Sequence, residues 1–222
     1  MDLIMLPNKS DFSKSSVASF DVDAQKGFTP LCPDELPVPG GDDIVPELNM
    51  QARFARFRVG SKDAHSRNAL WAATKENPQF SKIIGDDMDV RWNMHCEIGT
   101  KGFELLDGLP DEKDYDYFVW KGIEPDMHPY GACYHDIART LSTGVIEFLW
   151  QKRVRVVIVE GLATDYCVKH TVNQLLAAGF TVVVNLGACR AVHSDDFIYV
   201  VKGLRAAGAI MIDSARDLEI YQ

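Results

Sequence analysis

The sequence predicts an α/β fold: a three-layer α/β/α sandwich, Rossmann-like, around a mostly parallel, six-stranded sheet. Two observations support this prediction. Short runs rich in β-branched residues alternate with segments of helical hydrophobic spacing. In addition, 46% of the 222 residues are hydrophobic, which is enough to bury a core. We expect one domain that spans residues 1–222.

The N-terminal part supplies two strands and a helix. The apolar run 17–22 ends at a Gly- and Pro-rich loop and predicts the first strand. Apolar positions at helical spacing after an acidic first turn predict a helix at about 43–52. Period-two alternation from residue 55 to 59 predicts a second strand that runs into Asp63.

The segment 64–116 is rich in charge, Gly and Trp and has little periodicity. So long an irregular segment in a compact domain is usually functional, and we expect it to form a pocket wall. The remainder returns to alternating strands and helices. The expected bounds are strands 117–120, 154–159, 181–184 and 209–212, with helices beginning near 145 and 167 and covering 195–207.

Charge and cysteine content narrow the class of partner. The net charge of −9 disfavours nucleic acid and anionic membrane surfaces and favours a small-molecule substrate. Five cysteines without a CxxC pair favour a reducing, cytoplasmic location. The start, 1–7, lacks a basic region, and no run reaches the roughly 20 apolar residues of a membrane helix. The oligomeric state stays open, with a homo-oligomer as one option.

Reactive residues follow the predicted strands. Asp23 follows the first strand, Asp63 and His65 the second, Lys121 the third and Cys167 the fourth. Because the carboxyl ends of parallel strands share one edge of a sheet, we expect these side chains to meet there. Each alone has an ordinary structural explanation. Together they supply a general base, a cation and a nucleophile, as acyl transfer requires.

Cys167 is predicted to lie in the first turn of a helix. An arbitrary buried cysteine is more often a small hydrophobic residue. At a helix N-terminus, however, the dipole and a neighbouring Lys are expected to lower the pKa of the thiol. The free N–H groups there could also bind an oxyanion.

Asp63, His65 and His95 form a candidate metal site. The Asp-x-His spacing places two ligand side chains on the same side of an extended segment. Without a third ligand a surface pair would be the better interpretation, and His95 supplies that ligand. Three ligands leave room for water or a substrate nitrogen. We interpret the other histidines as structural or surface residues: His128, His135, His170 and His193.

Longer motifs carry a family resemblance that covers about residues 17–213. The chain resembles the nicotinamidase branch of the isochorismatase-like hydrolase superfamily, whose fold it is then expected to share. The motifs are Val22-Asp23-Ala24-Gln25 with Phe28, Ser61-Lys62-Asp63-Ala64-His65, Trp92 to Cys96, Lys121-Gly122, and Gly161-Leu-Ala-Thr-Asp-Tyr-Cys167-Val.

The resemblance implies hydrolysis of nicotinamide to nicotinate and ammonia in NAD salvage, and of pyrazinamide, through a cysteine thioester. It implies a catalytic triad and one divalent metal that holds the pyridine nitrogen, with zinc as the first candidate and iron or manganese as alternatives. The implied residues are Asp23, Lys121 and Cys167 for the triad, and Asp63, His65 and His95 for the metal.

The resemblance also implies substrate contacts. Phe28 and Trp92 would sandwich the pyridine ring. A cis peptide bond before Ala163 would direct the Ala163 N–H, together with that of Cys167, at the oxyanion. Trp71 could stack on a ring too, with ordinary packing an equal alternative.

One departure concerns the metal site. Several relatives have another histidine shortly after the Asp-x-His motif, and residues 66–71 contain none. Waters or Glu76 are expected to complete the coordination. Three other functions stay open: an N-carbamoyl amide hydrolase, an isochorismatase, and a non-catalytic binding protein on this fold.

Overall fold

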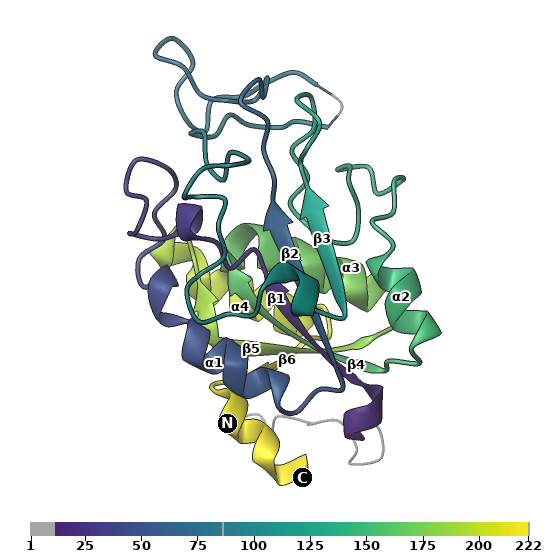
Figure 1. Cartoon of the computed structure of the whole chain (residues 1–222). Helices are drawn as coiled ribbons and strands as arrows, with labels where there is room; N and C mark the ends of the chain where they lie inside the picture. The colour runs from purple at the N-terminus through teal and green to yellow at the C-terminus, as the bar shows by residue number, and fades with distance from the viewer. Residues whose placement is uncertain (1–11, 86, 222) are drawn as a thin grey trace.

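The computed structural model describes residues 12–85 and 87–221 (Figure 1). Its sheet has six strands in the order β3-β2-β1-β4-β5-β6, and all neighbouring pairs are parallel. The predicted α/β class and the six-stranded sheet are confirmed, and the sheet is parallel throughout. The first seven residues, which we examined for a targeting signal, lie outside the described range.

The central strand is β1, which pairs with β2 on one side and β4 on the other. This order brings the ends of four neighbouring strands, β3, β2, β1 and β4, side by side at one edge. The strands are β1 (Val17–Val22), β2 (Phe57–Asp63), β3 (Tyr117–Lys121), β4 (Val156–Leu162), β5 (Thr181–Arg190) and β6 (Ile210–Ile212).

Helices cover both faces of the sheet. In β4, Val157 and Val159 belong to the apolar core that includes residues of α2, α3 and α4. The intervening Val156 and Ile158 belong to the core on the other face, with α1 and the C-terminal 3-10 helix. The helices are α1 (Val45–Ala52), α2 (Val145–Gln151), α3 (Lys169–Ala177), α4 (Phe197–Ala206) and the 3-10 helix Ala215–Tyr221.

Several element bounds differ from those expected. β1 has the predicted bounds, whereas α1 begins later because Gly41–Asp43 forms a separate 3-10 turn. β5 continues six residues past the expected end at 184. Its register against β4 shifts, after which Cys189 and Arg190 pair with the end of β4. The sequence pattern missed this resumption because a polar Asn and a Gly interrupt the run.

The long segment between β2 and β3 extends over the carboxyl ends of these strands (Figure 1). Its described residues contain one short 3-10 turn, Glu112–Asp114, and isolated bridges such as that between His65 and Glu97. The segment therefore covers the edge where the strand-end residues lie. In the described part of the chain no helix is both long and apolar enough to span a membrane.

Candidate active site

Asp23 follows β1 directly, with a positive φ of 45°. Its buried carboxylate accepts a hydrogen bond from the hydroxyl of Ser61 on β2, with Oγ 2.7 Å from Oδ1. The Asp23 N–H in turn donates to the same hydroxyl at 3.3 Å. The neighbouring strand therefore holds this side chain at the sheet edge.

Lys121, the last residue of β3, connects the predicted residues. Its Nζ lies 3.0 Å from Asp23 Oδ2 and 3.7 Å from Cys167 Sγ. It also donates a short hydrogen bond to Asp63 Oδ1 at the end of β2. All four side chains are buried. The structure thus brings together a thiol, two carboxylates and an ammonium group from four neighbouring strands.

Cys167 belongs to a π-helical turn, Thr164–Val168, between β4 and α3. The sequence predicts it in the first turn of an α-helix, but α3 begins only at Lys169. The wider turn is closed by the Val168 N–H, which donates to the carbonyl of Ala163 at 3.1 Å. The peptide bond before Ala163 is cis, as the resemblance implied.

The expectation of a lowered thiol pKa is wrong. Burial raises the pKa of Cys167 well above its ordinary value; Lys121 opposes the rise, and Asp23 and Asp63 add to it. The thiol is therefore protonated at neutral pH, and a base must take its proton before the sulfur can attack.

The two carboxylates differ in their affinity for a proton. Burial raises the pKa of Asp23, against the lowering effect of Lys121. For Asp63, Lys121 and the adjacent histidine His65 outweigh burial and hold the pKa well below its ordinary value. Asp23 is thus suited to accept and return a proton, while Asp63 stays ionised.

The predicted metal ligands also lie together. The free carboxylate oxygen of Asp63, Oδ2, is 3.4 Å from Nε2 of His65 and 3.8 Å from Nε2 of His95. The other ring nitrogens are bonded, since Nδ1 of His65 lies 3.1 Å from the Gly122 carbonyl and Nδ1 of His95 lies 2.6 Å from that of Asn93.

The hydrogen bonds of the two histidine rings show whether this group of residues could hold a metal ion. Metal-binding histidines typically donate one ring N–H to a carbonyl and keep the other nitrogen for the metal. Both rings have this arrangement, and the buried Nε2 of His65 has no hydrogen-bond partner among the described residues. One carboxylate oxygen that lies within 3.8 Å of two such nitrogens suits a divalent metal ion.

The structure places Glu76 and His128 differently from what the sequence predicts. Glu76 is exposed, and neither cluster of ligand-type side chains in the described ranges includes it. His128, which we interpreted as structural, is buried beside the metal-ligand candidates. One nitrogen each of His65, His95 and His128 lie within 4.8 Å of one another.

A small cavity reaches these groups. Phe28, Trp92 and Ala163, the three predicted substrate contacts, all line it. Trp71 instead packs against His65, with ring centroids 4.5 Å apart. The full lining is Phe28, Leu36, Asp63, Trp92, His95, His128, Tyr130, Ala163, Tyr166, Cys167 and Val192.

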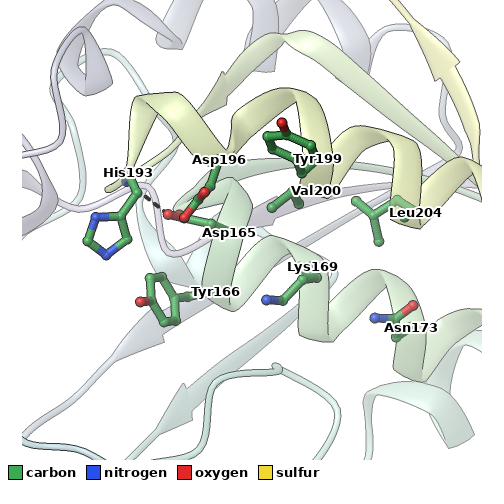
Figure 2. A pocket seen from close by; sticks show the side chains of 10 residues that line it. Asp165, Tyr166, Lys169, Asn173, His193, Asp196, Tyr199, Val200 and Leu204 are labelled. Carbon is green, nitrogen blue, oxygen red and sulfur yellow. Dashed lines mark hydrogen bonds between the residues drawn. The ribbon is translucent and has the colours of Figure 1, made fainter. Parts of the chain in front are cut away.

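A wider groove lies between α3 and α4 (Figure 2). Tyr166 borders both the groove and the cavity. The nearby carboxylate of Asp165 accepts hydrogen bonds from the N–H groups of Val192 at 3.0 Å and His193 at 2.9 Å. Asp165 therefore attaches the π-helical turn to the loop after β5, which forms one cavity wall.

Comparison with known proteins identifies the family. The isochorismatase domain matches residues 20–216, nearly the whole chain. This chain belongs to the isochorismatase domain family.

Within the isochorismatase domain family, several of the proteins that it resembles are nicotinamidases. The nicotinamidase of Acinetobacter baylyi is 30% identical over 201 residues, which cover 89% of this chain and 92% of the relative. The structure of a nicotinamidase/pyrazinamidase from Acinetobacter baumanii matches with a TM-score of 0.82 and 27% identity over 92% of this chain and 98% of that one. A Pyrococcus horikoshii pyrazinamidase, solved in complex with zinc, matches with a TM-score of 0.70 and 25% identity over 89% and 98%.

Two residues that position the site of this isochorismatase-domain protein, Gln25 and Ser61, were not predicted as site residues. The Gln25 side chain pairs with the Asp63 backbone: its Nε2 donates to the carbonyl, and its Oε1 accepts from the N–H, both at 2.8 Å. Ser61 holds Asp23. Both residues stand in motifs quoted above, and a polar residue at a buried strand end was the available signal.

Proposed function

We propose that this protein is a nicotinamidase, which hydrolyses nicotinamide to nicotinate and ammonia and acts in NAD salvage. The observation that carries the proposal is the contact of Lys121 with both Asp23 and Cys167 at one sheet edge, beside a metal-ligand set and a cavity that the thiol lines. A nucleophile alone would support an amidase, and the adjacent metal donors favour a substrate with a ring nitrogen. Pyrazinamide, which has the same ring-nitrogen and carboxamide arrangement, is a second expected substrate.

In the first half-reaction, Asp23 accepts the proton of the Cys167 thiol and Lys121 stabilises the resulting thiolate. The sulfur attacks the carboxamide carbon. Ala163 and Cys167 line the same cavity, and their N–H groups are proposed to bind the oxyanion. Asp23 then returns its proton to the leaving nitrogen, so that ammonia departs and a nicotinoyl thioester remains.

In the second half-reaction, Asp23 is again a carboxylate and takes a proton from an attacking water. The tetrahedral intermediate collapses, the C–S bond breaks, and nicotinate leaves. The thiolate regains a proton from Asp23. Its raised pKa suits Asp23 to this double task, because the carboxyl group must hold a proton for part of each cycle.

We further propose that Asp63, His65 and His95 hold a divalent metal ion, with zinc as the first candidate. When bound, such an ion would coordinate and polarise the pyridine nitrogen. Support for zinc comes from the donor chemistry and from the zinc-bound pyrazinamidase named above. Phe28 and Trp92 are proposed to contact the two faces of the ring.

An ammonia-release assay tests the nucleophile. The purified protein should release ammonia from nicotinamide, and Cys167→Ala should reduce turnover to background while the metal content stays that of the wild type. Cys133→Ala is a matched control, since this thiol is also buried but does not line the cavity. Turnover retained in the Cys167 variant would remove the proposed mechanism.

Metal analysis tests the ligand set independently. His95→Ala should lose most bound metal, as measured by elemental analysis after dialysis, because one of three donors is removed. An unchanged metal-to-protein ratio would show that the metal binds elsewhere.

A substrate panel separates this function from its rivals. Nicotinamide should be hydrolysed much faster than benzamide, which lacks the ring nitrogen. Preference for an N-carbamoyl compound would favour the other amidohydrolase class, and absence of any turnover with an intact metal site would favour a binding protein.

A further inference from the structure

His128 has an environment that a merely structural histidine would not keep. It lies in the irregular segment after β3, and its side chain is buried. Its backbone N–H donates to the carbonyl of Asp87 at 2.8 Å. Neither ring nitrogen, however, has a hydrogen-bond partner among the described residues. Buried polar groups are nearly always partnered, so the ring calls for a ligand.

The ring faces the candidate metal ligands. It is stacked on His65, with ring centroids 5.3 Å apart and an angle of 20° between planes. The ring of His95 lies 5.9 Å away. One nitrogen from each of the three rings falls within 4.8 Å of the others. In neutral rings the nitrogens free of protons offer lone pairs, and a shared cation is the partner that satisfies all three.

Packing does not explain this choice of residue. On its other sides His128 meets aromatic rings, Trp71 at 4.5 Å and Trp92 at 5.9 Å between centroids. A residue retained only to fill this space would be apolar, since an unpartnered imidazole is costly to bury. His65 and His95 each bond one nitrogen to a carbonyl and keep one free, whereas both nitrogens of His128 are free.

We propose that His128 is a fourth protein ligand of the metal, supplied by the segment after β3. The inference rests on the metal site of the proposed function and deepens it. It replaces the expectation that waters or Glu76 complete the coordination. The third imidazole that residues 66–71 lack would then come from a distant part of the chain, with Asp63, His65 and His95 as the other three donors.

Zinc coordination gives a readout that does not depend on activity. X-ray absorption spectra of the zinc-loaded wild type should fit three imidazole ligands, and those of His128→Gln should fit two. The affinity for zinc, from competition with a chromogenic chelator, should fall about ten-fold or more in this variant. His170→Gln is a matched control, because this half-buried histidine lies outside the cluster and should keep wild-type affinity.

Metal-free stability guards against a folding artefact. The unfolding midpoint of metal-free His128→Gln should match that of the wild type, and His128→Phe, which fills the same space without a nitrogen, should show the same loss of zinc affinity. Wild-type spectra with two imidazoles, or wild-type affinity in both variants, would overturn the proposal.

The comparison with His65→Gln keeps the two proposals apart. If this variant loses zinc while His128→Gln keeps wild-type affinity, the three-donor site stands and the fourth ligand is wrong. If none of these changes alters zinc affinity, the metal site of the proposed function fails as well.

Discussion

The ammonium group of Lys121 lies between two carboxylates with different proposed tasks. It pairs with Asp23, the proposed proton carrier, and with Asp63, a proposed metal ligand. Two buried acids and one buried cation leave a surplus negative charge, which is costly in a low-dielectric interior. The raised pKa of Asp23 relieves this surplus, because the carboxyl group can hold a proton there. The site therefore combines a fixed ion pair with one mobile proton.

Gly122 supports the metal site through its lack of a side chain. Its φ is +71°, and an added Cβ would lie 2.7 Å from Cε1 and 2.8 Å from Nδ1 of His65. Gly122→Ala should therefore displace the His65 ring and break its bond to the Gly122 carbonyl. We expect zinc affinity to fall about ten- to a hundred-fold, measured by chelator competition.

Gly99→Ala is the matched control for this change. Gly99 also has a positive φ, +86°, but an added Cβ would meet nothing within 4 Å. This variant carries the same backbone strain without touching His65 and should bind zinc as the wild type does. Equal losses in both variants would attribute the effect to strain alone.

At the scale of elements, the side chain of Asp165 attaches the π-helical turn to the loop after β5. The Asp165 carboxylate accepts hydrogen bonds from the backbone N–H groups of Val192 and His193, and Figure 2 shows the bond from His193. The amide of Asp165→Asn can accept only one of these bonds and opposes the other with its own NH₂ group. We expect the free energy of unfolding to fall by about 1–3 kcal/mol, measured by urea denaturation, and KM to rise because Val192 lines the cavity.

Asp195→Asn controls for charge in the same region. Asp195 is exposed, so its replacement should leave both the stability and KM close to wild type. A stability of Asp165→Asn equal to that of this control would mean that the two hydrogen bonds contribute nothing.

The elements also show what the sequence could predict. Strand ends were visible because β-branched runs stop at polar residues, and parallel pairing then places Asp23, Lys121 and Cys167 at one edge. The π-helical turn was not visible, because one extra residue per turn leaves no periodic trace. His128 was missed for a related reason: it stands in an irregular segment, and only the tertiary fold brings it to His65.

For the molecule as a whole, the doubly covered sheet buries acids as well as apolar residues. Glu160 on β4 is fully buried; its Oε2 accepts from Asn185 Nδ2 at 2.8 Å, and its Oε1 has no partner among the described residues. Burial, reinforced by the nearby Asp21, raises the pKa of Glu160 well above its ordinary value. The folded protein thus retains a proton here that the unfolded chain releases at lower pH.

This pKa makes stability depend on pH with a definite sign. The contribution of Glu160 is fully present below about pH 4.3, where the unfolded chain is also protonated, and it is lost as the pH rises toward the folded pKa. Glu160→Gln keeps the bond to Asn185 and removes the titration. We therefore expect the Tm of Glu160→Gln minus the Tm of the wild type to increase from pH 5 to pH 8.

The exposed Glu219→Gln serves as the reference for this series. This variant changes the net charge by the same amount, but at a solvated position. Its Tm difference from the wild type should hardly vary with pH. If the Tm difference between Glu160→Gln and wild type is equally flat, the buried carboxyl group does not contribute to the pH dependence.

The position of β1 in the sheet has a consequence for protein synthesis. A ribosome translates β1, β2 and β3, and with them Asp23, Asp63 and Lys121, before it translates β4. One edge of β1 then stays unpaired until β4 has been made, because Val17 pairs with Val156, which lies far along the sequence. Such distant parallel pairing is slow to form. Cys167 is therefore brought next to Asp23 and Lys121 only at a late stage of the folding of the nascent chain.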